Sequence, residues 1–76
     1  MIFDEVKEII AQQLEISEDD IDLDSDIYND LDAGKYDMVD IAMTVEEQYS
    51  IELTEEALDE ISTVGDLVAF IENSID

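Results

Sequence analysis

The chain has 76 residues and carries 24 acidic side chains against two lysines, which gives a formal net charge of -22. This charge argues against binding to nucleic acid or to an anionic membrane through a basic face, and it favours basic partners. The absence of cysteine and histidine excludes disulfides and removes the usual nucleophile–base pairs and most transition-metal ligands, so we expect no enzyme activity.

The length predicts one domain, and we expect residues 1–76 to form it. High net charge is typical of disorder, yet 46% apolar residues in regular spacing favour a folded monomer. No apolar stretch approaches the roughly 18 residues of a membrane span, and the first residues are acidic where a signal peptide is basic. We therefore expect a cytoplasmic protein with no membrane contact.

The first predicted helix runs from Ile2 to about Leu14, because apolar residues recur there at spacings of three and four. Acidic residues in its first turn complement the positive end of the helix dipole. Lys7 lies among acidic residues and can pair locally with Asp4 or Glu8. The expected core stripe contains Ile2, Phe3, Val6, Ile9, Ile10 and Leu14.

A long connection is predicted from Ile16 to Gly34, with one short turn capped by Ser17. Nearly twenty residues without regular structure need to be anchored to the core or to have a function. Apolar residues at intervals are the expected anchors: Ile16, Ile21, Leu23, Ile27 and Leu31.

Alternating acidic residues in this loop suggest a calcium site, since calcium prefers oxygen ligands. Counting from Asp22, however, the sixth position is Ile27 rather than glycine, and the twelfth is Ala33 rather than glutamate. We therefore expect no specific metal site, only weak and non-specific binding of divalent cations. The acidic residues in question are Asp20, Asp22, Asp24, Asp26, Asp30 and Asp32.

The segment from Asp30 to Tyr49 is the strongest helix candidate, with Gly34 as its N-cap and Asp37 at the third helical position. At about 100° per residue, one broad arc forms the core face, and a second, narrower arc lies roughly a third of a turn away. This second arc, the outer stripe, is either a docking surface or core packed beneath the long loop. The core face contains Met38, Ile41, Ala42, Val45 and Tyr49; the outer stripe contains Tyr36, Val39 and Met43, bordered by Asp37, Asp40, Glu46 and Glu47.

Two more helices are predicted after a short extended link. Thr54 caps a brief third helix, and Thr63 with Asp66 forms a near capping box at the start of the fourth. Gly65 slightly weakens the first turn of the fourth helix, because glycine has a low helix propensity. The link contributes Ile51 and Leu53 to the core, the third helix contributes Leu58 and Ile61, and the fourth contributes Val64, Leu67, Val68, Ile71 and Ile75.

A resemblance to a known family rests on two segments, DLDAGKYDMVDIAMTVEEQY and TEEALDEISTVGDLVAFIE, and extends over the whole chain. The first is similar to the attachment loop and acidic second helix of acyl carrier proteins, and the second to their third and fourth helices. The resemblance implies an all-α bundle of three main helices plus one short helix, with a long first loop. It also places Lys35 where the family has the serine that carries 4'-phosphopantetheine. We therefore expect no modification of Lys35 and no cofactor on this chain.

The resemblance implies that the acidic second helix docks on basic patches of biosynthetic enzymes. Our first hypothesis is an acidic docking module that lacks the serine for loading. The second is an ordinary acyl carrier protein of fatty-acid or polyketide biosynthesis whose attachment serine is substituted in this chain. The third is a polyanionic mimic of nucleic acid, which would need charge but no apolar stripe. The expected docking residues are Tyr36, Asp37, Val39, Asp40, Met43, Glu46 and Glu47.

Overall fold

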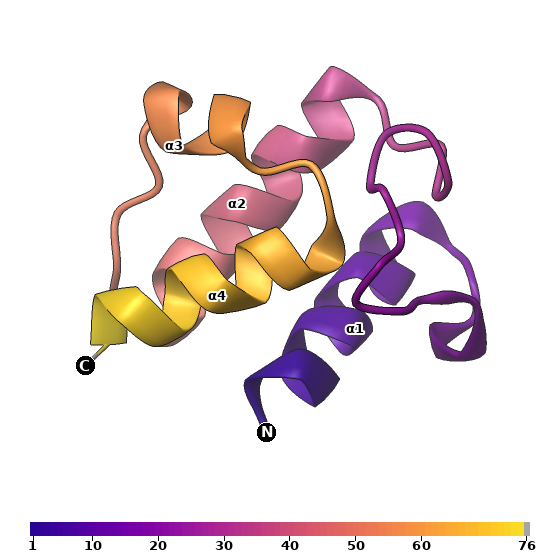
Figure 1. Ribbon diagram of the computed structural model, residues 1–76, viewed down its shortest axis with the longest axis horizontal. Coiled ribbons are helices and arrows are strands. Elements are labelled where there is room, and N and C mark those ends of the chain that lie inside the picture. Colours follow the sequence, from indigo (N-terminus) through magenta and orange to yellow (C-terminus); the bar gives the residue numbers. More distant parts are fainter. Residues whose placement is uncertain (76) are drawn as a thin grey trace.

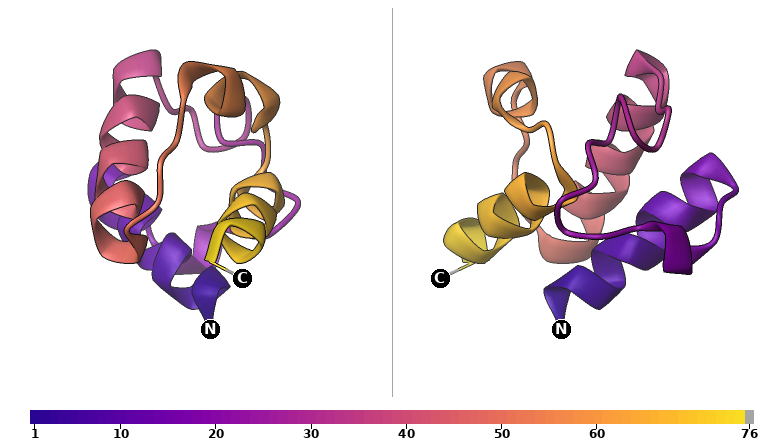
Figure 2. Two further views of the ribbon diagram at one scale, coloured as in Figure 1. Left: turned by 90° about the vertical axis from the view of Figure 1, so that its left-hand side faces the viewer. Right: turned by 45° about the vertical axis from the view of Figure 1, so that its right-hand side comes forward.

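Helices surround one apolar core in the computed structural model, which describes residues 1–75 (Figure 1). Both α2 and α4 pack against α1, and the short helix α3 lies across the opposite end of the bundle (Figure 2). The predicted all-α fold, with its long first loop, is therefore confirmed. The elements are α1 (Ile2–Leu14), the 3-10 helix η1 (Glu18–Asp20), α2 (Lys35–Tyr49), α3 (Glu55–Glu60) and α4 (Val64–Ile75).

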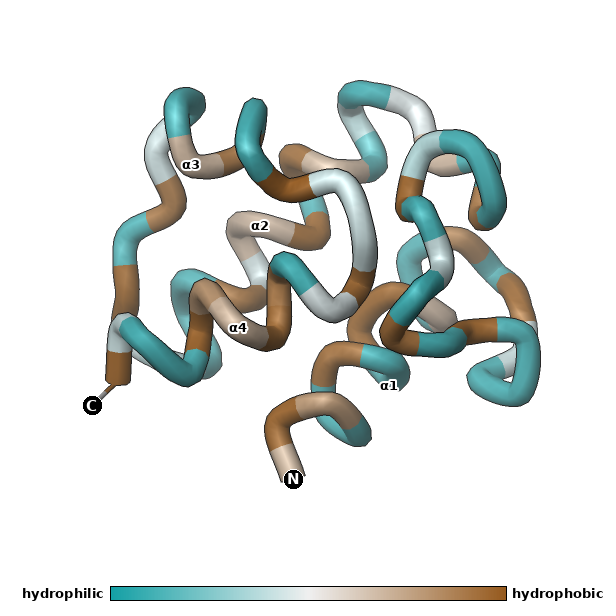
Figure 3. Tube along the Cα trace, viewed as in Figure 1, coloured by the Kyte–Doolittle hydropathy of each residue, from teal (hydrophilic) through white to brown (hydrophobic). Residues whose placement is uncertain are grey.

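The core consists mainly of the helix faces that apolar spacing predicts. Val6 and Ile10 of α1 and Ile41 and Val45 of α2 are completely buried. Hydrophobic and hydrophilic residues alternate along these helices, whereas the loop between α1 and α2 is hydrophilic with isolated hydrophobic residues (Figure 3). Tyr49 is only half-buried, and its hydroxyl is buried without a hydrogen-bond partner among the described residues. The apolar periodicity thus accounts for the packing of α1 on α2.

The predicted helix caps are confirmed. Ser17 is the N-cap of η1, and the Thr54 hydroxyl accepts a hydrogen bond of 3.2 Å from the Ala57 backbone N–H at the start of α3. At α4, the Thr63 hydroxyl accepts from the Asp66 N–H at 3.0 Å, while the Asp66 carboxylate accepts from the Thr63 N–H at 3.1 Å. These reciprocal bonds satisfy backbone donors that a helix end leaves unpaired.

The long loop is anchored to the segment that joins α3 to α4. The Ile27 N–H donates to the Ser62 carbonyl at 2.8 Å, and the Val64 N–H donates to the Ser25 carbonyl at 3.0 Å. The two segments form an isolated antiparallel bridge at this point. Backbone pairing therefore holds the loop in place in addition to its apolar side chains.

Leu23 contradicts the prediction that its side chain anchors the loop, because that side chain is 46% exposed. Its backbone makes the anchoring contact instead: the Leu23 carbonyl accepts a hydrogen bond of 2.9 Å from the Gly65 N–H. A Cβ atom at position 65 would lie 3.0 Å from the same carbonyl oxygen, a tighter contact than Cβ atoms usually make, so the close approach favours glycine. The other predicted anchors contact the core as expected: Ile16 is partly buried, and Ile21, Ile27 and Leu31 are buried.

One prediction at a helix start is confirmed, and one at a helix end is corrected. Helix α2 begins at Lys35 with Gly34 as its N-cap, as predicted, and residues 30–33 of the Asp30–Tyr49 segment belong to the loop. Ile75 is 48% exposed rather than part of the core, since the last turn of α4 lies at the edge of the molecule (Figure 1). Among residues 1–75, no helix combines the length and apolar character needed to cross a bilayer.

Candidate docking surface on helix α2

The N-terminal turn of α2 places a lysine in an acidic environment. Lys35 is the first helical residue and is exposed. The Gly34 N–H donates a hydrogen bond of 3.0 Å to the Asp37 carboxylate, which stabilises the start of the helix. A cation here opposes the helix dipole, whereas the Asp37 charge favours it. Asp37, a predicted docking residue, therefore also stabilises the end of its own helix.

The outer stripe of α2 faces solvent. Tyr36 is 84% exposed, Val39 40% and Met43 55%. Glu47, one turn beyond Met43, is also exposed. The alternative in which this stripe packs beneath the long loop is therefore wrong, and the helix presents an apolar strip in water beside acidic residues.

The other predicted acidic residues make contacts within the protein. The Gln13 side-chain amide of α1 donates to Asp37 at 3.5 Å and to Asp40 at 3.3 Å. The Glu46 carboxylate accepts a hydrogen bond of 2.8 Å from the Leu53 backbone N–H and is only partly exposed. Glu46 thus fixes the link that follows α2, and Asp37 and Asp40 lie on the side of α2 that faces α1.

A crevice of about 270 Å³ opens beside the stripe, between α2 and α3. Apolar side chains from both helices line it, with charged side chains beside them. Burial raises the pKa of the Tyr28 phenol in this crevice, and the negative charges of Asp59 and Asp26 raise it further. Sequence reasoning did not identify this crevice, because it forms between segments that are distant in the chain. The lining residues are Tyr28, Lys35, Met38, Val39, Glu55, Leu58 and Asp59.

Acidic residues of the long loop bind its own backbone. Asp26 accepts hydrogen bonds of 2.9 Å from the N–H groups of Tyr28 and Asn29, and Asp30 accepts one of 2.8 Å from the Asp26 N–H. Within residues 1–75, no group of three or more acidic side chains is arranged to hold a metal ion. Weak binding of divalent cations stays a prediction.

Comparisons with known proteins identify the family. A family model described as phosphopantetheine attachment site matches residues 4–71. An acyl carrier protein from Sulfurovum sp. is 42% identical over 72 residues, which covers 95% of this chain and 96% of the relative. Acyl carrier proteins from Wolinella succinogenes and Clostridium acetobutylicum are 37% and 41% identical and cover 96% and 93% of this chain, and 96% and 92% of their own lengths. The chain therefore belongs to the phosphopantetheine attachment-site family, whose members are carrier proteins rather than enzymes and hold 4'-phosphopantetheine covalently.

Proposed function

We propose that this chain is an acyl-carrier-type protein of fatty-acid or polyketide biosynthesis that presents α2 to basic surfaces of partner enzymes. The observation that carries the proposal is the exposed outer stripe, Tyr36, Val39 and Met43, on an acidic helix. Carboxylates would raise the rate of association with a basic partner, while apolar contacts would slow its dissociation. A mimic of nucleic acid would have no use for the apolar strip, so we favour a protein partner.

We further propose that Lys35 occupies the position of the family's attachment serine. A phosphodiester to the prosthetic group requires a hydroxyl oxygen, and the lysine side chain ends in an amine. Lys35 is exposed at the first position of α2 and lines the crevice between α2 and α3. The chain therefore has the helices of a carrier protein, but Lys35 does not fit 4'-phosphopantetheine. The family's prosthetic group is not expected on this chain as it stands.

Two versions of this function remain distinct. The similarity to proteins named acyl carrier protein favours an ordinary carrier whose serine is replaced by Lys35 in this chain. The lysine itself favours the second version, a docking module that works without loading. The two versions differ in whether a serine at position 35 would accept the prosthetic group.

Loading assays distinguish the versions. Coenzyme A and a broad-specificity phosphopantetheinyl transferase should leave the intact mass of the unaltered chain unchanged, because Lys35 offers no hydroxyl. Lys35→Ser should gain the mass of one phosphopantetheine group, and Lys35→Ala, the matched control, should gain none. Loading of Lys35→Ser supports the ordinary carrier, and its failure supports the module that works without loading. A mass gain on the unaltered chain would overturn the assignment of Lys35.

The docking part is tested in the Lys35→Ser background by the transferase's own kcat/KM. We expect Met43→Ala to lower kcat/KM about tenfold with little change in its salt dependence, as for loss of an apolar anchor. Asp40→Asn with Glu47→Gln should lower it mainly at low salt and flatten the salt dependence. Glu72→Gln, an exposed acid on α4, is the charge control. Equal effects of the control and the α2 variants would contradict docking through α2.

A further inference from the structure

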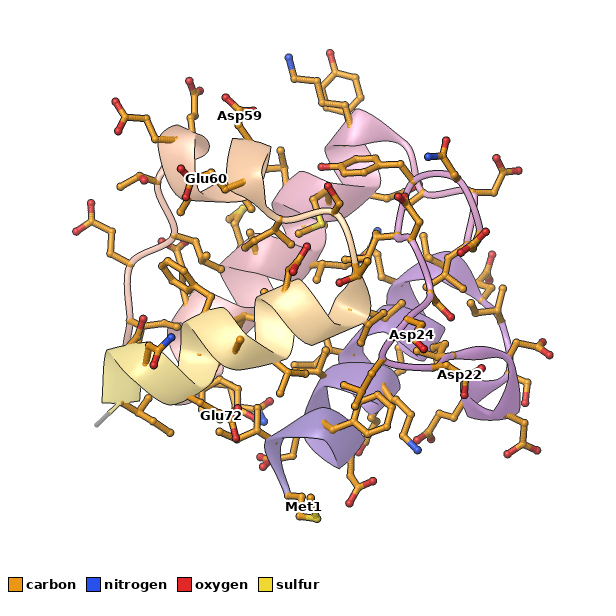
Figure 4. All side chains as sticks on the ribbon, viewed as in Figure 1. Met1, Asp22, Asp24, Asp59, Glu60 and Glu72 are labelled. Atoms are coloured by element: carbon orange, nitrogen blue, oxygen red, sulfur yellow. The ribbon has the colours of Figure 1, made fainter. Side chains whose placement is uncertain are left out.

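A second surface hollow lies away from α2, between the start of α1 and the long loop, with a volume of about 490 Å³. It shares no lining residue with the crevice beside Lys35. Figure 4 shows this separation: Asp22 and Asp24 lie on the long loop, whereas Asp59 and Glu60 lie on α3 at a different end of the molecule. The lining residues are Phe3, Asp22, Leu23, Asp24, Ser25 and Asp30.

The structure holds the apolar centre of this hollow in a fixed position. Leu23 is 46% exposed although its backbone is tightly bound through the Gly65 N–H. The surrounding turn is closed by a hydrogen bond of 3.0 Å from the Ser25 N–H to the Asp22 carbonyl, and by one of 3.0 Å from the Asp22 N–H to the Ser25 hydroxyl. These bonds order the backbone of the turn before any partner binds, so a partner that covers Leu23 restricts mainly its side chain.

A half-buried aromatic ring completes the apolar part of the hollow. Phe3 packs partly against the core and also lines the hollow. The Lys7 ammonium lies 4.7 Å from the centroid of the Phe3 ring and 3.7 Å from an Asp4 oxygen. Lys7 and Lys35 are the two basic side chains of the whole chain. Lys7 offsets part of the negative charge on the Phe3 side of the hollow. With 24 acidic side chains against two lysines, the aspartates of the hollow still lie in a net negative field, which favours a cationic partner.

We propose that the hollow is a second docking surface, for a basic amphipathic peptide segment of a partner protein. An apolar side chain of that segment contacts Phe3 and Leu23, while its lysines or arginines pair with Asp22 and Asp24. A second copy of this chain is a poor occupant, because two bodies of net charge -22 repel each other. The small size of the patch indicates a weak, transient contact. Since the hollow and the α2 stripe are separate, one partner can contact both or two partners can bind at once.

The test uses the full unaltered chain and a synthetic amphipathic peptide of alternating lysine and leucine pairs, long enough for four helical turns. Amide chemical shifts report where the peptide binds, and titration gives the dissociation constant. We expect shift changes around Leu23 and Phe3 and about tenfold weaker binding there in Leu23→Ser, as for truncation of an apolar anchor. The Leu23 side chain is exposed and its anchoring bond is a backbone bond, so the variant keeps the fold.

Two controls separate this surface from general charge attraction. Ile75→Ser removes a leucine-sized side chain that is 48% exposed on α4, and Val39→Ser shortens the α2 stripe; neither should weaken binding at the hollow. A peptide of the same charge with serine in place of leucine should bind the hollow much more weakly. The proposal is overturned if shift changes are confined to α2, if Leu23→Ser binds as tightly as the unaltered chain, or if the serine peptide binds equally well.

Discussion

Helix α2 and the loop between α1 and α2 bring apolar residues to the core and to the surface in different ways. In α2, helical geometry separates a buried face, with Ile41 at 0% exposure, from an outer stripe with Met43 at 55%. In the loop, Ile27 at 0% and Leu23 at 46% have no such period between them. Backbone bonds to the α3–α4 link and to the first residues of α4 decide which loop side chain points inward. The exposure of an apolar side chain is therefore set by local helical geometry in α2, and by backbone bonds to distant residues in the loop.

The largest expected effect tests whether a loop residue is as much part of the core as a helix residue. Ile27→Ala and Ile41→Ala should each lower the free energy of unfolding by about 2–5 kcal/mol, because both remove a completely buried side chain. Urea denaturation measures this loss, with the Leu23→Ala variant as the exposed counterpart, expected to change stability by less than about 0.5 kcal/mol. If Ile27→Ala is as mild as Leu23→Ala, the loop is not part of the core.

A smaller effect is expected at the contact that turns Leu23 outward. Gly65→Ala should destabilise by about 1–2 kcal/mol, since the new Cβ would lie 3.0 Å from the Leu23 carbonyl oxygen and this outweighs the better helix propensity of alanine. The matched control is Gly34→Ser, where a Cβ has its nearest contact at an ordinary 3.5 Å and serine is a good N-cap. A Gly65→Ala variant as stable as the unaltered chain would show that the loop yields at little cost.

The helices could be predicted because their causes are local. The spacing of apolar residues predicted a helix from Ile2 to about Leu14, which are the observed ends of α1. Thr54 and Thr63 identified the starts of α3 and α4. The position of Leu23 could not be predicted, because it depends on a close backbone contact with Gly65, more than forty residues further along the chain. The apolar side chain of Leu23 predicted an anchor, but the backbone bond to Gly65 leaves that side chain exposed.

In the candidate site, too, local features could be predicted and contacts between distant segments could not. The helical spacing of apolar residues predicted an outer stripe on α2, and in the structure Tyr36, Val39 and Met43 are exposed to solvent. It gave no sign that Glu46 would bond to the Leu53 N–H, or that Tyr28 would reach the crevice beside Lys35. Both contacts join residues from different elements. Helical periodicity assigns a residue to a face, and only the tertiary fold shows which neighbour meets that face.

The smallest expected effect concerns the start of α4, to which the long loop is tied. The Thr63 N–H and then the Ser62 N–H donate hydrogen bonds to the Asp66 carboxylate and hold the pKa of that group below its usual value. A carboxyl group whose pKa is lower in the folded protein stabilises the fold above its unfolded pKa, near 3.9, and this contribution is lost as pH falls through the folded value.

Asp66→Asn should therefore be less stable than the unaltered chain near pH 6, and the difference should shrink as the pH is lowered from about 4. Urea denaturation at several pH values measures both free energies of unfolding. Thr63→Ala is the control, because it removes a hydroxyl cap worth about 1 kcal/mol that does not titrate. Most of its deficit should persist in acid, because the Thr63 side chain is only a minor cause of the lowered Asp66 pKa. If the Asp66→Asn deficit also persists unchanged at low pH, the carboxylate charge does not stabilise this helix start.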